Sequence, residues 1–319
     1  MFSRKLAQGA LWLGLSLVAG IVLLLQFRGP AAESAAPKNR PGGPKLESIR
    51  GSMEKLRPLH RRLGRPETGD WLASYPEPGQ TFEQYLSDRP APSDPRLTTL
   101  YLQPIGELNA AQRQLIDETG QILGRFYRMP LKTLRTLSLD IIPRHSRREH
   151  PSWGDKQILS TYVLDTVLIP RRPADAVAVL ALATSDLWPG EGWNFVFGQA
   201  SLTERVGVWS IYRYGDPADK RQYRECLRRT LKVALHETGH MLGLLHCTAY
   251  ECGMNGSNNL AETDRAPMAF CPECSAKVWW ACGVAPDRWY EDLAELAERH
   301  DLDQEAASWR KCRTALSGR

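Results

Sequence analysis

The sequence predicts an α/β fold, a sandwich in which helices cover a mixed β-sheet. The first observation behind this prediction is that helical and strand patterns alternate along the middle of the chain. The second is the composition, because 319 residues with 42% hydrophobic side chains can bury one sizeable core. The sequence contains no internal repeat, so we expect a single such core.

In the predicted core, helices and strands alternate before two further strands follow. Residues 176–183 (AVAVLALA) form an uninterrupted apolar run, which is typical of a buried strand. The later strands have the β-branched and aromatic content of sheet segments. In order, we expect a helix at 110–127, a strand near 137–142, a helix near 156–168, and strands at 176–183, 194–202 and 205–214.

The next predicted element is a helix at residues 223–242, and it carries the pattern His-Glu-x-x-His. His236 and His240 are four residues apart, so their rings lie side by side over one turn, as two imidazoles that share a metal ion must. Glu237 points slightly aside, where its carboxylate can act as a general base on a metal-bound water. This short pattern alone also fits a surface helix with two scattered histidines.

A glycine and a third histidine make the pattern more specific. Gly243 can end the helix, because glycine adopts the left-handed conformation without a steric cost. Three residues later, His246 can turn back as a third ligand. Three neutral imidazoles leave a fourth position open, where zinc lowers the pKa of a water molecule to about 7. The sequence has neither a GxSxG nor a GxxxxGK[ST] motif, so competing hydrolase and nucleotide chemistries lack support.

Four cysteines follow the histidines in two close pairs: Cys247 and Cys252, then Cys271 and Cys274. Two pairs of thiolates are typical of a closed, structural zinc site. Two disulfides or reduced core thiols are the alternatives, although cysteines three residues apart seldom bridge each other. Because Cys247 directly follows His246, we expect this second site to fix the backbone that carries the third histidine.

These motifs resemble the archaemetzincins, a branch of the metzincin metallopeptidases. The resemblance extends through the segment from Met254 to Pro267 and upstream to Ser185-Asp186-Leu187, and it covers about residues 97–285. The gap between Cys252 and Cys271 differs by one residue from the usual count of the family. The resemblance implies a metzincin-like α/β sandwich with a mixed sheet, an active-site helix and a four-cysteine zinc knuckle.

The resemblance also implies roles for the individual residues. His236, His240 and His246 would bind a catalytic zinc, and Glu237 would be the base and acid in hydrolysis of a peptide bond. Met254 would be the Met-turn residue beneath the metal, although an ordinary core methionine has the same properties. The second zinc ion would be held by the four cysteines, Cys247, Cys252, Cys271 and Cys274. A late strand at the sheet edge would receive an extended peptide substrate.

A second class of function also fits the sequence, namely a catalytically weak or inactive, zinc-stabilised module that binds peptides. Glu237 favours the enzyme, because the base and all three histidines are present. The sequence predicts neither the substrate nor the oligomeric state.

Residues 9–27 are free of charge and long enough to cross a membrane as a helix. We therefore expect an N-terminal anchor at residues 1–28 and a membrane localisation, with a cleaved signal peptide as the alternative. Residues 29–46, rich in proline, glycine and alanine, predict a linker. Residues 47–96, here called the N-terminal extension, show short helical patterns at 47–63 and 81–86, and the catalytic domain would span 97–285. Residues 286–319 predict two C-terminal helices.

The charge is unevenly distributed. Residues 1–65 carry 12 basic and 3 acidic side chains, which leaves 29 basic against 33 acidic residues in the remainder. The predicted catalytic part is therefore not basic, so we expect no nucleic-acid binding, whereas the N-terminal part suits anionic lipid headgroups or is simply a solvated charged face.

The remaining histidines and cysteines lie outside these spacings. We expect the histidines to be on the surface and the cysteines to be buried or surface thiols, with Cys282 as an alternative metal ligand. These residues are His60, His145, His150, His300, Cys226, Cys282 and Cys312.

Overall fold

The computed structural model describes residues 22–24, 43–88, 94 and 96–318, and its main sheet has six strands. The strand order is β1-β8-β9-β6-β2-β3, and every neighbouring pair is parallel except β8 and β9. The predicted mixed sheet is therefore confirmed. The bounds are β1 Val22–Leu24, β2 Thr99–Ile105, β3 Leu131–Thr133, β6 Ala176–Ala183, β8 Gly198–Ser201 and β9 Val206–Ser210.

Both faces of this sheet are covered. Side chains such as Leu100 and Leu180 share one core with helices α4 (Ala110–Phe126) and α6 (Tyr223–Met241). Alternate side chains such as Val179 pack on the other face, against α5 (Ser160–Tyr162) and the π-helix Val163–Leu168 that continues it. This two-sided burial is the predicted sandwich, and it explains why residues 176–183 are apolar throughout.

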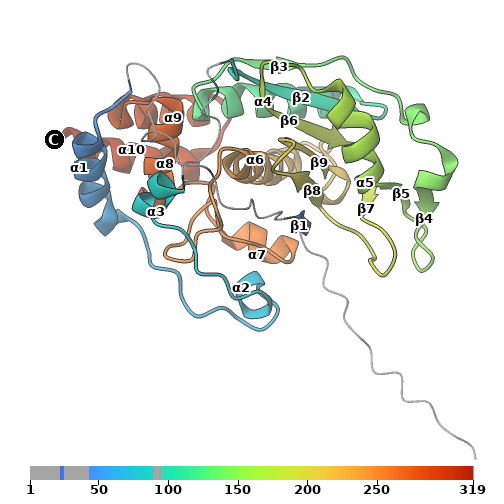
Figure 1. Ribbon diagram of the computed structural model, residues 1–319, viewed down its shortest axis with the longest axis horizontal. Coiled ribbons are helices and arrows are strands. Elements are labelled where there is room, and N and C mark those ends of the chain that lie inside the picture. The colour runs from blue at the N-terminus through green and yellow to red at the C-terminus, as the bar shows by residue number, and fades with distance from the viewer. Residues whose placement is uncertain (1–21, 25–42, 89–93, 95, 319) are drawn as a thin grey trace, which may run out of the picture.

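Further elements lie at the two ends of the main sheet (Figure 1). At one end α9 (Pro286–Arg299) and α10 (Asp303–Ser317) pack together, and α1 (Leu46–Leu56) contacts α8 (Pro272–Cys282) and α10. At the other end lies a small sheet of β4 (Arg147–Glu149), β5 (Lys156–Leu159) and β7 (Asp186–Trp188). The short helices are α2 Trp71–Ser74, α3 Phe82–Ser87 and α7 Leu260–Arg265, and 3-10 turns lie at 57–59, 139–141, 144–146, 169–171 and 212–214.

Most predicted elements are present. The helix at 110–127 and the strand at 176–183 are confirmed, and α9 and α10 are the two helices predicted within residues 286–319. The predicted strand at 137–142 is wrong, because the Ser138 hydroxyl accepts a hydrogen bond from the Asp140 N–H and starts a 3-10 turn. Residues 156–159 are a strand rather than the start of a helix, and β2 was not predicted.

The prediction of a membrane anchor is contradicted. Of residues 9–27, only 22–24 lie within the described part of the chain, and they form β1, which pairs in parallel with β8. Among the described residues no helix is both long enough and apolar enough to span a bilayer. The predicted anchor and signal peptide otherwise fall outside the described residues, as does nearly all of the predicted linker.

Candidate active site and metal centres

Helix α6 positions the first two histidines. His236 and His240 lie one turn apart near its C-terminal end, with 2.9 Å between their Nε2 atoms. The helix ends at the predicted place, because Gly243 has a φ of +87° and the Leu244 N–H returns to the Gly239 carbonyl at 3.0 Å. The Tyr85 hydroxyl donates to the Leu242 carbonyl at 2.9 Å, so this carbonyl at the C-terminal end of the helix also has a hydrogen-bond partner.

His246 turns back toward this pair, as the sequence predicted. Its ring centroid lies 5.2 Å from that of His236 and 4.8 Å from that of His240. One ring nitrogen from each of the three lies within 4.8 Å of the others, so the three rings, called here the histidine cluster, could hold one metal ion.

The second nitrogen of each α6 ring faces a carbonyl. His236 Nδ1 lies 2.9 Å from the Gly253 oxygen, and His240 Nδ1 lies 2.7 Å from the Leu244 oxygen. A carbonyl only accepts, so both Nδ1 atoms must carry the proton. In the neutral rings two Nε2 lone pairs then face each other across 2.9 Å, which is repulsive unless a cation lies between them. The donor set therefore fits a zinc ion.

Glu237 lies on the same helix and is fully buried. Neither of its carboxylate oxygens has a hydrogen-bond partner among the described residues. Burial raises the pKa of this carboxyl to about 8, and the nearby Trp209 indole, which favours the ionised form, only partly offsets it. A buried carboxylate with no hydrogen-bond partner does not contribute to the stability of the fold, and such a group is a candidate for a functional role.

Met254 lies directly beneath this turn of α6. It is fully buried, and a Cβ atom placed on Gly239 would lie only 2.6 Å from its sulfur. Gly239 therefore lets the thioether approach the helix between the two histidines. The Met-turn role of Met254 stays a prediction.

The four cysteines form a second cluster. Cys247, Cys252, Cys271 and Cys274 are buried, none of them is in a disulfide, and their sulfur atoms lie within 4.8 Å of one another. The Cys252 sulfur accepts hydrogen bonds from the backbone N–H groups of Met254 at 3.4 Å and Cys271 at 3.2 Å. Four thiols around one point with N–H donors behind them suit a closed tetrahedral zinc site, and the disulfide alternative is wrong.

The two clusters share a backbone. Cys247 follows His246, and its N–H donates to the Met254 carbonyl at 2.7 Å. The Asn255 side chain accepts from the Cys252 N–H at 2.8 Å and donates to the Cys247 carbonyl at 2.6 Å. The third histidine and the Met-turn are thus fixed to the loop that carries the cysteines.

A carboxylate that the sequence did not single out also reaches the histidine cluster. The Glu77 Oε2 atom lies 2.8 Å from His246 Nδ1, although the two residues are 169 positions apart. No local motif marks this glutamate, because its role depends on how the N-terminal extension crosses the site.

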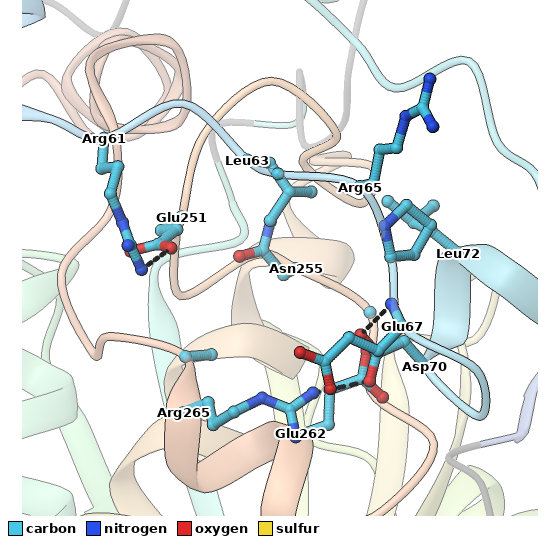
Figure 2. A pocket seen from close by; sticks show the side chains of 14 residues that line it. Arg61, Leu63, Arg65, Glu67, Asp70, Leu72, Glu251, Asn255, Glu262 and Arg265 are labelled. Carbon is cyan, nitrogen blue, oxygen red and sulfur yellow. Dashed lines mark hydrogen bonds and ion pairs between the residues drawn. The ribbon is translucent and has the colours of Figure 1, made fainter.

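Two pockets lie near the histidine cluster and the loop that carries the cysteines. A pocket of about 340 Å³ separates the N-terminal extension from the loop after Cys252 (Figure 2). Its walls are charged, and ion pairs join Arg61 to Glu251 and Arg265 to Asp70. A smaller cavity of about 30 Å³ borders His236 and is lined by Asn255 and Ala266, which also line the larger pocket.

The other histidines and cysteines have no metal partners among the described residues. Cys226, Cys282 and Cys312 are buried, and the cysteine cluster does not include Cys282. Of the histidines expected on the surface, only His145 is exposed, whereas His60 and His300 are half-buried. The expectation is wrong for His150, which is 3% exposed and whose ring stacks on Trp153 with centroids 3.3 Å apart.

The fold and the two ligand clusters define a zinc metallopeptidase, and comparisons with known proteins agree. Residues 173–279 match the model of peptidase family M54. Human Archaemetzincin-2 is 33% identical in an alignment of 274 positions that covers 75% of this chain and 75% of that protein. The archaemetzincin of Pyrococcus abyssi (strain GE5 / Orsay) is 36% identical over 185 residues, covering 56% of this chain and 93% of that protein.

Among solved structures, the crystal structure of archaemetzincin from Methanopyrus kandleri is 29% identical, with a TM-score of 0.47, and covers 60% of this chain and 98% of that chain. The identity and coverage of the curated relatives decide the family. The chain belongs to the archaemetzincins.

Proposed function

We propose that this archaemetzincin hydrolyses peptide bonds at the histidine cluster, with Glu237 as general base and then general acid. The proposal rests chiefly on one observation: three imidazole nitrogens converge within 4.8 Å of one another, and Glu237, which directly follows His236, is a buried carboxylate with no hydrogen-bond partner among the described residues. His236, His240 and His246 would hold the catalytic zinc. When bound there, zinc supplies a Lewis acid that polarises a peptide carbonyl and lowers the pKa of water.

The environment of Glu237 suits both proton transfers. As general base it accepts a proton from the attacking water, which converts the buried charge into a neutral acid. Burial favours that neutral form, because a buried charge without a hydrogen-bond partner is costly. The protonated carboxyl is then able to donate to the leaving amine. A carboxyl that was exposed, with an ordinary pKa, would hold this proton less well at neutral pH.

We also propose that Cys247, Cys252, Cys271 and Cys274 hold a second, structural zinc. Support comes from their complete burial and from the N–H groups that face the Cys252 sulfur. Burial raises the pKa of the Cys252 thiol, so a cation is needed to keep it deprotonated. This zinc would fix the Cys247 backbone and so the position of His246. The protein would carry two zinc ions with different tasks.

The substrate would lie across the histidine cluster, and two features of the structure indicate where its chain would bind. The small cavity beside His236 suits one side chain, and the shared residues Asn255 and Ala266 lead from it toward the charged pocket. A peptide that added to strand β8 would take the position that residues 22–24 occupy in β1. We propose residues 97–285 as the unit that carries the chemistry.

Peptide-library digestion by the zinc-loaded full-length protein, with products identified by mass spectrometry, tests this function. Glu237→Gln should lower the cleavage rate by about 100-fold or more while both zinc ions stay bound, because the amide cannot accept the proton. Equal cleavage by both proteins would show that Glu237 is not the base. Absence of cleavage by the zinc-loaded wild type would favour the alternative, a zinc-stabilised module that binds peptides without cutting them.

A further inference from the structure

We propose that Glu77 is a positioning residue of the catalytic metal centre, so that the N-terminal extension completes a site whose ligands all lie 159 or more residues later in the sequence. The inference rests on the proposed zinc site at the histidine cluster. It assigns a task to a part of the chain that lies outside residues 173–279, the part that matches the family model.

The three histidines differ in what holds their Nδ1 atoms. His236 and His240 face the neutral carbonyls of Gly253 and Leu244, which belong to the same part of the chain as the ligands. His246 instead faces the Glu77 carboxylate, with 2.8 Å to Oε2 and 3.1 Å to Oε1. A carboxylate is a stronger acceptor than a carbonyl, and it fixes the proton on Nδ1 and leaves Nε2 free for a metal.

Glu77 is itself held in place. Its Oε1 atom accepts a hydrogen bond from the Trp71 indole at 3.1 Å, and the Trp71 ring lies edge-on to the His246 ring with centroids 5.1 Å apart. The Trp71 backbone N–H donates to Glu262 at 2.9 Å. The indole also packs on Gly256, where a Cβ atom would lie 2.3 Å from the ring. The Glu77 carboxylate, the Trp71 indole and the His246 imidazole therefore all contact one another.

The segment that carries Glu77 is anchored on both sides of it. On one side the Gln80 side chain accepts from the Leu245 N–H at 3.2 Å, and Lys277 donates to the Gln80 carbonyl at 2.5 Å. On the other side Arg265 pairs with Asp70 at 2.6 Å across the charged pocket (Figure 2). These contacts tie residues 70–80 to the loop before Cys247, to helix α7 and to helix α8, so Glu77 approaches His246 from a fixed direction.

His246 needs such support more than the other two histidines do. His236 and His240 are carried by a helix, whereas His246 lies beyond the end of that helix, in a loop. The Cys247 backbone fixes one side of this residue, and the Glu77 carboxylate fixes its ring. Removing the carboxylate should therefore loosen the third ligand without removing any ligand.

The experiment measures zinc affinity in the full-length protein by chelator competition, together with the absorption spectrum after cobalt substitution. Glu77→Ala should raise the Kd of the catalytic zinc about 10- to 100-fold and shift the cobalt bands, because ligand geometry and basicity both change. Glu77→Gln, which can still accept the hydrogen bond, should fall between Glu77→Ala and the wild type. Glu83→Gln is the matched control: it removes an exposed carboxylate of the same extension, which pairs with Arg50, and should change neither readout.

The outcomes separate this inference from the proposed function. Wild-type affinity and an unchanged cobalt spectrum in both Glu77 variants would overturn the inference alone. Equal loss of zinc from the histidines and the cysteines would make Glu77 a structural residue and would also overturn it. A wild-type protein that binds no zinc at the histidines would overturn both proposals. Recovery of affinity in Glu77→Asp, relative to Glu77→Ala, would support the positioning role.

Discussion

The histidine and cysteine clusters are joined at consecutive residues, His246 and Cys247, yet their surroundings are opposite in kind. Behind the imidazoles lie hydrogen-bond acceptors, namely two carbonyls and the Glu77 carboxylate. Behind the Cys252 sulfur lie donors, the backbone N–H groups of Met254 and Cys271. Neutral ligands that carry a proton on the far nitrogen need acceptors, whereas anionic thiolates need donors.

The difference explains how one short segment can serve two purposes. Three neutral imidazoles would leave the full charge of a zinc ion available to a substrate, and the residue after His236 is a buried glutamate with no hydrogen-bond partner among the described residues. Four thiolates would instead enclose the ion and leave no position for water. The cysteine side therefore suits a structural role and the histidine side a catalytic one, and this contrast predicts unequal effects when either side is damaged.

The largest effect is expected from damage to the cysteine cluster. Cys271→Ser should lower the zinc content at both clusters and reduce peptide hydrolysis about 100-fold or more, although residue 271 touches no substrate. The reason is that a structural zinc contributes about 10–16 kcal/mol to the folding of its site, and here that site fixes the backbone next to His246. Elemental analysis and a cleavage assay on the same sample measure both quantities.

Cys312→Ser is the matched control for that experiment. Cys312 is as buried as the cluster cysteines but lies outside the cluster, so this variant should keep both zinc ions and its activity. Full activity of Cys271→Ser with one zinc per chain would show that the two clusters are independent. It would contradict the idea that the backbone shared by His246 and Cys247 couples them.

Damage to the histidine cluster should have a narrower effect. His240→Ala should abolish hydrolysis and leave one zinc per chain, because no cysteine depends on that ring for its position. The thermal midpoint should change by less than about 4 °C, since the cysteine zinc remains in place. Loss of both ions from His240→Ala would mean that zinc binding at the cysteine cluster also depends on the histidine cluster.

A smaller effect is expected at the contact beneath the active-site helix. Gly239→Ala would place a methyl group 2.6 Å from the Met254 sulfur, so we expect a loss of about 1–3 kcal/mol in the free energy of unfolding. Zinc affinity should fall at the histidines and not at the cysteines. Gly51→Ala in α1, where a Cβ atom meets nothing within 4 Å, should be neutral or stabilising. Denaturant titration of the two variants checks the difference, and equal stability would contradict the close packing of Met254.

How much of the molecule the sequence predicts depends on how far apart the contributing residues lie. The convergence of the three histidines could be predicted because two share one helix turn and the third follows within six residues. The cysteine pairs are also locally spaced, and both sets converge as expected. Glu77 could not be predicted, because it meets His246 only after the N-terminal extension has crossed the site.

The fold shows the same limit. Strand β6 was predicted with its bounds, since eight consecutive apolar residues are buried on both faces. Its neighbour β2 was missed because Gln103 and Pro104 interrupt the apolar pattern, and only pairing along the full length of β6 makes it a strand. The start of the segment at 156–168 became β5 because Gln157 donates to Asp186 at 2.7 Å and so belongs to the small sheet.

The smallest effect concerns a histidine on the cysteine side that belongs to neither cluster. Burial lowers the pKa of His60, whose ring lies edge-on to Tyr250 with centroids 6.5 Å apart. The unfolded chain then gains a proton near pH 6.5 that the folded chain does not, so His60 makes stability fall as the pH drops below that value. We compare how far the thermal midpoint falls between pH 7.5 and pH 5.5 in the wild type and in His60→Gln. The fall should be larger in the wild type, by about 2 °C or less. Release of zinc by acid affects both proteins alike and cancels in this difference. The exposed His145 provides the control, and a His145→Gln variant that behaves like His60→Gln would rule out burial as the cause.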